Sequence, residues 1–287
     1  MGNVELLPAA PEHLPELGRI CDDAFRQVAR SHGFEDDFPD ANVATKVLQL
    51  ILGLPGSFGV AASLDGRLVG SNFLLLTDSV AGVGPITVDP VCQGRNIGRR
   101  LMEAVLQHAA ARGITRVRLL QDACNTTSLS LYASLGFDVR EPVGLLKAGP
   151  VCPADPTVRL AGTGDLPTLA NLGARIYGVS RRKELAAWLE RGFPVLVIED
   201  HGRLHGYLVP GKLGHGVAET EALALSLIAQ IPRHARPGTN FFFCPLRNTA
   251  LYRSLLKAGC RLTKIMTLMA RGPYEEPGPV WMPSIVF

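Results

Sequence analysis

The sequence lacks the features that mark several classes of protein. Aromatic residues make up only 6% of its 287 residues, the net charge is only +3, and no long basic run is interleaved with aromatics. Because nucleic-acid-binding surfaces need clustered Lys and Arg, nucleic acid is not an expected partner. The uncharged stretch 47–64 is interrupted by three glycines and a proline, so it predicts a helix end, a turn and a strand, and no membrane association is expected.

Cysteine usage and nucleotide motifs narrow the class further. The six cysteines form no Cys-x-x-Cys pair and do not cluster with histidine, so we expect no metal site and reduced thiols, as in a cytoplasmic protein. The chain has no Gly-x-x-x-x-Gly-Lys-Ser/Thr and no Gly-x-Gly-x-x-Gly after a strand, which argues against the common nucleotide-binding loops. The N-terminus lacks the basic start and apolar core of a signal peptide.

What is present indicates two folded domains. Apolar residues make up 47% of the chain and charged residues 19%, which is enough to bury real cores. A chain of this length exceeds one domain of ordinary size. The segment 150–156 contains three prolines and is typical of a linker. We therefore expect one domain over residues 1–150 and a second over residues 151–287.

Hydrophobic periodicity predicts strands and helices that mix along the first domain. The expected strands are 4–7, 57–63, 67–77, 83–88, 115–121 and 137–147, and the expected helices are 11–30, 40–53, 97–112 and 126–135. This pattern predicts an α/β fold with a mixed, twisted central sheet and helices on both faces. The same fold class is expected for the second domain.

A loop suited to an anion follows the strand that ends at Val88. A helix begins near Asn96, directly after a turn, and the first N–H groups of a helix have no internal partner. Gly98 would let an anion approach this backbone closely. The same end of the helix carries three cations: Arg95, Arg99 and Arg100. Cations oppose the dipole at a helix N-terminus, which favours a bound anion, although an ordinary turn with solvated arginines is the alternative.

These residues carry a resemblance to a known family. The loop reads Gln93-Gly94-Arg95-Asn96-Ile97-Gly98, the strand before it reads Ile86-Thr87-Val88-Asp89-Pro90, and Asn125, Tyr132, Gly136 and Phe137 follow in order. Together they resemble the core of the GCN5-related N-acetyltransferase (GNAT) superfamily over roughly residues 3–148. One departure is Asn96, which stands where the family has glycine, but Asn tolerates the left-handed conformation better than most residues.

The resemblance implies an enzyme that binds acetyl-CoA and transfers its acetyl group directly to a primary amine of a small molecule or peptide. The implied cofactor-binding residues are Ile86, Thr87, Val88, Gln93, Gly94, Arg95, Asn96, Ile97, Gly98, Arg99 and Asn125. Tyr132 is implied as the acid that protonates the leaving thiolate. The sequence does not identify the general base, for which the candidates are Asp122, His32, Glu35, Asp36 and Asp37.

The second half repeats the first in order, but without its chemistry. Gly66–Gly70 returns as Gly202–Gly206, Asn125 as Asn248, and Gly136 as Gly259, so that residues 125–150 align with 248–273 without a gap. An ordered self-match of this kind predicts a duplicated domain. Leu255 stands at the position of Tyr132, no Gln-x-x-Gly-x-Gly is present, and Glu219 and Glu221 are expected where phosphates would lie. We therefore expect a degenerate second copy without cofactor.

Two alternatives to an enzyme remain at this stage. The chain could be an acyl-CoA-binding sensor whose catalysis has lapsed, with Asn96 as the best support for that reading. It could also be a scaffold in which the second half mediates dimers, so a homodimer is possible.

Overall fold

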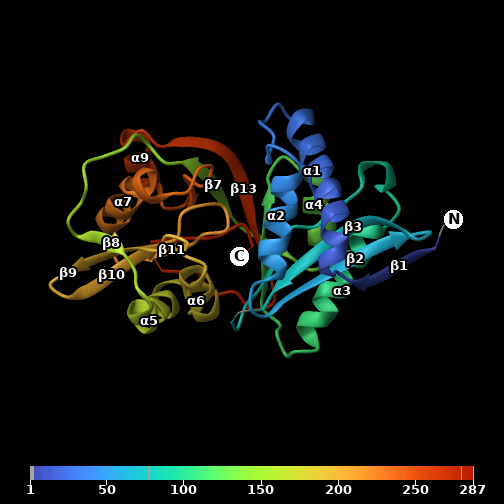
Figure 1. The fold of residues 1–287 in the computed structure, drawn as a ribbon, viewed down its shortest axis with the longest axis horizontal. Helices are drawn as coiled ribbons and strands as arrows, with labels where there is room; N and C mark the ends of the chain where they lie inside the picture. The colour runs from blue at the N-terminus through green and yellow to red at the C-terminus, as the bar shows by residue number, and fades with distance from the viewer. Residues whose placement is uncertain (1–2, 77, 279, 287) are drawn as a thin grey trace. The chain divides into compact units, whose positions relative to one another are not determined.

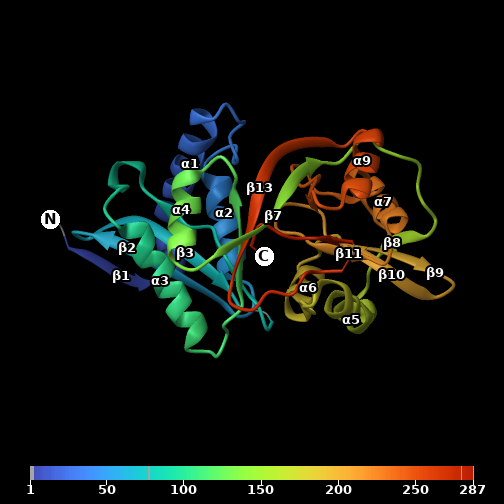
Figure 2. The ribbon, with the colours of Figure 1, turned by 180° about the vertical axis from the view of Figure 1, so that it is seen from behind.

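The computed structural model describes residues 3–76, 78–278 and 280–286. Apart from single residues at the C-terminus, the chain divides into two compact units. The first unit contains the residues up to 119 together with 124–135, and the second contains 120–123 and 136–285. Figures 1 and 2 follow the chain from two opposite sides. Each unit is described by itself below.

The described residues of the first unit form a mixed sheet and several α-helices. Its strands are β1 (Val4–Pro8), β2 (Ser57–Leu64), β3 (Arg67–Leu75), β4 (Ala81–Val83), β5 (Thr87–Val88) and the start of β6 (Val117–Asp122). Its helices are α1 (Leu14–Ser31), α2 (Ala41–Leu52), α3 (Ile97–Ala110) and α4 (Thr126–Ser134). The strand order is β1-β2-β3-β4-β6, with β5 paired to β3, and only β4 and β6 run parallel. The predicted fold class is confirmed.

Local sequence explains how these elements form. The β2–β3 hairpin turns at Asp65 and Gly66, whose φ angles of 51° and 82° suit a two-residue turn with both central residues left-handed. The helix predicted over 97–112 is observed as α3, and its apolar residues recur at helical spacing and are all buried: Ile97, Leu101, Met102, Val105, Leu106 and Ala109. The strand predicted over 67–77 is observed as Arg67–Leu75, and Thr77 lies outside the described residues.

The prediction of one strand over 83–88 was wrong. The structure has two short strands there, β4 and β5, separated by Gly84, Pro85 and Ile86. Proline cannot donate to a strand ladder, and Gly84 has a φ of 136°, so the ladder with β3 is interrupted between the two strands. The break lets β4 pair in parallel with β6 while β5 pairs only with β3 in the part of the chain that is described.

The second unit contains a five-stranded antiparallel sheet in the order β14-β11-β10-β9-β8. These strands are β8 (Val158–Leu160), β9 (Leu196–Asp200), β10 (Arg203–Leu208), β11 (Gly216–Ala218) and β14 (Trp281–Met282). The helices are α5 (Leu166–Tyr177), α6 (Arg182–Glu190), α7 (Glu221–Ala229), α8 (Ile231–His234) and α9 (Thr249–Lys257). Phe242, Phe243 and Trp188 are buried, and Phe241 is half-buried.

A second set of strands in this unit includes β7 (Asp138–Lys147), which follows α4 in the sequence. It lies between β12 (Phe241–Pro245) and β13 (Arg261–Arg271) and runs antiparallel to both. The last strand before the proline-rich linker therefore packs with residues from the end of the chain. The division into functional domains at residue 150 stays a prediction.

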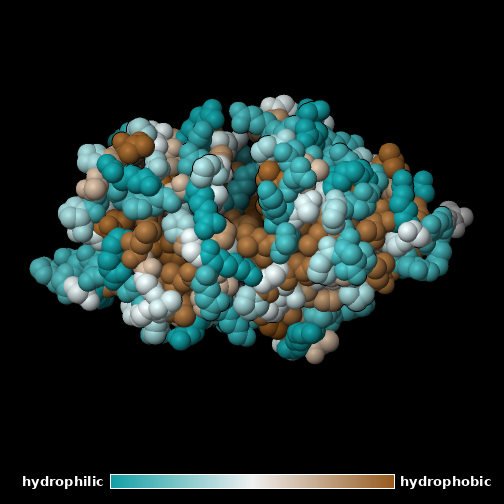
Figure 3. Space-filling model, viewed as in Figure 1, coloured by the Kyte–Doolittle hydropathy of each residue, from teal (hydrophilic) through white to brown (hydrophobic). Residues whose placement is uncertain are grey.

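The surface mixes polar and apolar residues. On the face seen in Figure 3, hydrophilic residues are interspersed with hydrophobic ones. Individual valines are exposed in the structure, including Val91 at 72% and Val151 at 64%. Among the described helices, none combines the length and the hydropathy that crossing a lipid bilayer requires.

Candidate active site

The short strand β5 presents one edge without a strand partner among the described residues. Thr87 and Val88 pair with Ser71 and Gly70 of β3, and the N–H of Asp89 donates to the carbonyl of Val69 at 2.8 Å. In an antiparallel ladder this pattern makes Val88 and Gly70 a non-hydrogen-bonded pair. The N–H and C=O of Val88 therefore point away from β3, toward the open edge.

The loop after β5 has the backbone that the motif requires. Asp89 accepts a hydrogen bond from the Val91 N–H at 3.1 Å and starts a short turn of 3₁₀ helix, Pro90–Cys92. Gly94 and Asn96 then adopt left-handed conformations, with φ angles of 76° and 64°. Asn96 therefore takes up the geometry that glycine would provide, as expected. The Gln93 side chain donates from Nε2 to the Val88 carbonyl at 3.2 Å and ties the loop to the open edge.

Helix α3 begins without a side-chain cap. The Asn96 side chain makes no capping hydrogen bond, and the first turn contains no acidic residue. The first intrahelical bond of this turn runs from the Arg100 N–H to the Asn96 carbonyl, so the N–H groups of 97–99 have no acceptor within the helix. Such a start attracts an anion, because these N–H groups and the helix dipole both favour negative charge.

The three arginines at this end have different surroundings. Arg95 is exposed on the loop. Arg99 donates from Nη2 to the Ser134 hydroxyl of α4 at 2.6 Å, and Arg100 donates from Nη1 to the Val4 carbonyl at 2.7 Å. Arg99 and Arg100 thus also join α3 to α4 and β1. The link from Arg99 to Ser134 was missed by the sequence analysis, since an Arg and a Ser so far apart in sequence carry no pattern.

Gly98 is the point at which the elements of the site meet. A Cβ atom built on it would lie 3.5 Å from Leu131 Cδ2 on α4 and 3.9 Å from Val88 Cγ2 on β5. These are ordinary contact distances, so the start of α3 lies directly beside both elements. The structure therefore brings together the predicted strand edge, the predicted loop and the helix that carries Tyr132.

Helix α4 carries the two remaining motif residues. Asn125 caps it, accepting a hydrogen bond from the Ser128 N–H at 3.0 Å. Tyr132 is buried, at 5% exposure, and follows Leu131 in the chain.

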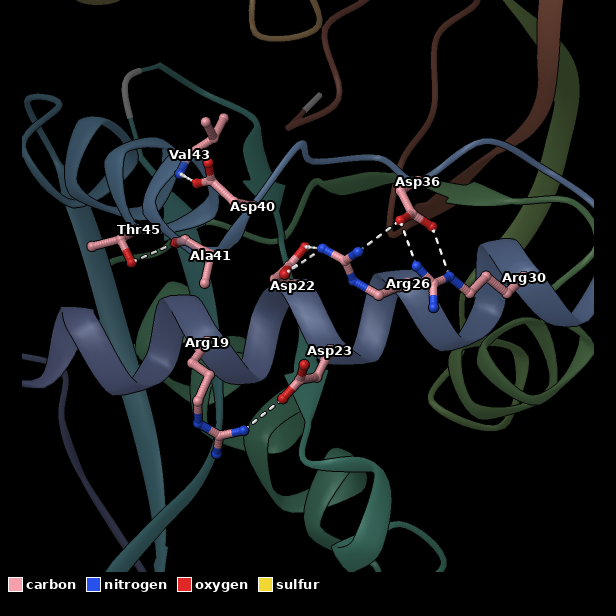
Figure 4. A network of polar contacts seen from close by, with 10 residues as sticks. All are labelled: Arg19, Asp22, Asp23, Arg26, Arg30, Asp36, Asp40, Ala41, Val43 and Thr45. Atoms are coloured by element: carbon pink, nitrogen blue, oxygen red, sulfur yellow. Dashed lines mark hydrogen bonds and ion pairs between the residues drawn. The ribbon is translucent and has the colours of Figure 1, made fainter.

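The candidates for a general base are mostly engaged elsewhere. Asp36 binds Arg26 at 2.8 Å and Arg30 at 3.1 Å, as Figure 4 shows, and the hydrogen bond from Arg30 lowers the pKa of the Asp36 carboxyl. A carboxylate held this way is a weaker base. In the second unit, Asp122 is paired with Lys264 at 3.1 Å; Lys264 is buried and Asp122 is half-buried. Each arrangement is that of a structural ion pair.

The loop between α1 and α2 holds the other candidates, His32, Glu35 and Asp37. His32 is exposed, with Nδ1 at 2.9 Å from the Val28 carbonyl, and Glu35 is also exposed. Asp37 is half-buried. None of these residues is singled out as a base by its geometry.

The corresponding segment of the second half is built differently from the prediction. Glu219 does not lie at a phosphate position. Its N–H donates to the His205 carbonyl at 3.0 Å, as the Asp89 N–H donates to the Val69 carbonyl. Glu219 therefore occupies the position in the strand ladder that Asp89 occupies in the first half. Its carboxylate binds His205 at 2.7 Å and Arg203 at 3.0 Å, and also Arg175. The hydrogen bond with His205, followed by those from Arg175 and Arg203, lowers the pKa of Glu219 to about 2.

The N-terminus of α7 is capped by a side chain. Thr220 directly follows Glu219 and accepts a hydrogen bond from the Leu223 N–H at 3.3 Å, whereas six residues separate Asp89 from Asn96. The phosphate-sized loop is thus absent from this place in the second half. A cavity of about 470 Å³ elsewhere in the second unit, lined by residues such as Cys152 and Gln230, shares no residue with the predicted site.

Comparison with known proteins agrees with this geometry. A family model described as "Acetyltransferase (GNAT) family" matches residues 21–137. A mycothiol acetyltransferase from Thermomonospora curvata is 40% identical over 77 residues, and one from Tsukamurella paurometabola is 34% identical over 89 residues. These matches cover 26% of both chains in the first case and 30% of both in the second, so they span only about a third or less of these relatives.

Solved structures resemble the whole chain in fold. A putative acetyltransferase from Pyrococcus horikoshii has a TM-score of 0.79 at 16% identity, covering 97% of this chain and 92% of that one. A GCN5-related N-acetyltransferase from Sphaerobacter thermophilus has a TM-score of 0.65 at 17% identity, covering 96% and 98%. The strand edge, the loop and the helix start of the site all fall inside residues 21–137, the part of the chain that is similar to the acetyltransferase (GNAT) family.

Proposed function

We propose that the first half of this chain transfers an acetyl group from acetyl-CoA directly to a primary amine of a small molecule or peptide. The observation that carries the proposal is the Val88 N–H, which points to an open strand edge beside the uncapped start of α3. One end of the site suits an extended amide chain and the other suits a pyrophosphate. The acyl donor of this family has both parts.

Acetyl-CoA would bind from the open edge of β5 to the N-terminus of α3. Its pyrophosphate would accept hydrogen bonds from the N–H groups of Ile97, Gly98 and Arg99, with Arg95 nearby on the exposed loop. Its pantetheine amides would pair with the open edge of β5, for which the Gln93 side chain would have to leave the Val88 carbonyl. The absence of a side chain at Gly98 keeps the path from α3 to β5 open.

The chemistry then needs few groups. The Val88 N–H would polarise the thioester carbonyl, the amine nitrogen would attack the carbonyl carbon, and the C–S bond would break. The departing thiolate would take the Tyr132 proton, and the proton released by the amine would leave through water or a base. No cysteine is placed for an acyl-enzyme, since Cys92 is buried in the turn before the loop and Cys124 precedes α4.

The second half supports the proposal by what it keeps and what it lacks. Asn248 caps α9 as Asn125 caps α4, and Gly259 and Gly136 follow these helices with φ angles of 81° and 83°. Leu255, at the place of Tyr132, is fully buried and has no acidic proton. We infer a duplicated domain whose second copy has lost the donor loop and the acid.

A thermal-melt titration with acetyl-CoA tests the proposal. A ligand at a hundred times its Kd stabilises by about 2.7 kcal/mol, which is a shift of several degrees. We expect a shift in the wild type and in Tyr132→Phe but not in Gly98→Glu. Gly164→Glu is the matched control, because a side chain there would meet no neighbouring atom and Gly164 lies in the second unit.

Each result has a clear meaning. No shift in any variant would refute donor binding. A shift without turnover against a panel of primary amines would instead favour the acyl-CoA sensor. The names of the mycothiol acetyltransferases suggest an amine-bearing thiol precursor as one member of that panel, beside polyamines, amino acids and peptides.

A further inference from the structure

A segment near the end of the chain, here called the C-terminal strap, contributes the edge strand of the five-stranded sheet in the second unit. The C-terminal strap, residues 280–285, contributes β14, which pairs antiparallel with β11. Trp281 lies opposite Val217, and Met282 lies opposite Gly216. Val280, Trp281 and Met282 are all buried, so the strap is an integral part of the unit.

The two halves share one register at the strand that the strap covers. In the first half Val88 is opposite Gly70, and in the second Ala218 is opposite Gly206. A Cβ on Gly70 would lie 2.6 Å from the Thr87 carbonyl oxygen, and a Cβ on Gly206 would lie 2.7 Å from that of Val217. Both glycines are therefore required by the same close approach of two strands, and Ala218 is the counterpart of Val88.

The same ladder argument fixes where the Ala218 N–H points. The Glu219 N–H donates to the His205 carbonyl, so Ala218 and Gly206 form a non-hydrogen-bonded pair. The Ala218 N–H therefore points away from β10, and it donates to the Val280 carbonyl at 3.0 Å. In the second half, the counterpart of the proposed thioester-binding N–H is bound by a carbonyl of the chain itself.

Several further contacts hold the strap in place. The Trp281 ring stacks on Tyr177 of α5, with ring centroids 4.9 Å apart and planes at 24°. Arg181 donates from Nη2 to the Ser284 hydroxyl at 2.9 Å, and both residues are fully buried. Arg181 is itself paired with buried Glu184 at 2.7 Å. The Ile285 N–H donates to the Lys212 carbonyl at 2.8 Å.

We propose that β14 is a built-in occupant of the second half's donor slot, standing where the first half would take the pantetheine arm of acyl-CoA. The inference rests on the proposed function of the first half. An extended peptide and a pantetheine arm present the same alternating amide donors and acceptors to a strand edge. The intact chain would then bind one acyl-CoA, and the second slot would accept a pantetheine arm only when the strap is loosened.

Backbone amide spectra of the full chain test this inference. With coenzyme A we expect the amide signals of Thr87 and Val88 to shift while those of Val217 and Ala218 do not. The Ala218 amide should also exchange slowly with solvent, because it is protected by the strap. A shift at Val217 and Ala218 in the wild type would overturn the inference, since the slot would be open.

A full-length variant with a loosened strap gives the second arm. Trp281→Ala with Ser284→Ala removes the ring stack and the buried hydrogen bond. We expect Ala218 exchange to accelerate by more than about tenfold, and pantetheine alone to shift the Val217 and Ala218 signals. Should this variant fail to fold, Ser284→Ala gives the same readout with a smaller acceleration.

The remaining outcomes also decide the matter. Accelerated Ala218 exchange without any response to pantetheine would show that the slot does not fit a pantetheine arm. Unchanged exchange in a folded variant would show that the strap is not what protects this amide. Failure of Thr87 and Val88 to respond to coenzyme A would instead count against the proposed function of the first half.

Discussion

Helices α3 and α7 each follow a strand that pairs with its neighbour in the same register. Only at α7 are the polar groups around the helix start paired with other groups of the chain. At α7 the Thr220 hydroxyl caps the helix, Glu219 is bound by three basic groups, and the Ala218 N–H is paired with the strap. At α3 the Asn96 side chain makes no cap. The difference teaches that an acyl-CoA site of the kind proposed for the first half needs backbone N–H groups that folding leaves unpaired, whereas the second half pairs the corresponding groups with its own chain.

The largest expected effect concerns the residue proposed as the general acid, which has no counterpart in the second half. Tyr132→Phe should lower kcat by about 10²–10⁴-fold, because a positioned general acid contributes that much. It should leave the Kd of acetyl-CoA unchanged, since the ring is kept. Steady-state kinetics with direct binding measurements check this. Tyr252→Phe on α9 is the control, and an equal loss of kcat there would contradict the role of Tyr132.

A single methyl group added at the start of α3 should separate the effect on acetyl-CoA binding from the effect on stability. Gly98→Ala should leave the fold intact, since the added Cβ meets only ordinary contacts, and could stabilise the helix by up to about 1 kcal/mol. It should weaken acetyl-CoA binding by more than tenfold, because the methyl group would stand between the donor and the backbone. Calorimetric binding and urea unfolding measure the two effects, which should have opposite signs. Equal affinities would contradict the proposed path of the donor.

Substitution of the glycine at which two strands approach closely should lower stability to a similar degree in both halves. Gly70→Ala and Gly206→Ala would each place a Cβ under 3 Å from a backbone oxygen, so each should destabilise its unit by about 1–3 kcal/mol. Thermal unfolding measures the loss. A large loss at only one of the two positions would break the correspondence between Val88 and Ala218.

Because of Glu219, the free energy of unfolding of the second unit should depend on pH. The folded pKa of about 2 lies below the ordinary value of 4.5, so the stabilisation is complete above about pH 4.5 and is lost as the pH falls toward 2. Wild type should therefore exceed Glu219→Gln in free energy of unfolding at pH 6, and the gap should narrow at pH 3. Urea unfolding at the two pH values tests this, and a gap that widens in acid would contradict it.

The smallest effects should come from the helix caps. Asn125→Ala, Asn248→Ala and Thr220→Ala should each cost about 1 kcal/mol of stability, because each leaves one helix N–H unpaired. Asn96→Ala tests the contrast through a different mechanism, since its cost should come from the left-handed backbone alone. Asn96→Gly, which removes that strain, should be at least as stable as the wild type in urea.

Much of this could be predicted from the sequence, for identifiable reasons. The stripe of α3, the hairpin at Asp65 and Gly66, and the left-handed Asn96 all depend on neighbours close in the chain, where periodicity and turn chemistry operate. The break between β4 and β5 at Pro85 was open to the same reasoning and was missed because the apolar run continues through it.

The remaining features depend on contacts between distant residues. Glu219 was placed at a phosphate position because the alignment counted residues and could not see the strand register. The strap and the link from Arg99 to Ser134 leave no local pattern, since a two-residue strand and a single surface hydrogen bond have no periodicity. Only the folded chain shows them.

The position of β7 has a consequence for how the protein is made. The strand leaves the ribosome soon after α4, yet both of its neighbours, β12 and β13, are synthesised about a hundred residues later. Until then β7 has two unpaired edges, which are ready templates for pairing with other chains. A nascent or truncated chain that stops near residue 150 should therefore aggregate. Residues 1–150 would stay free of aggregation only once β12 and β13 have been synthesised and have paired with β7.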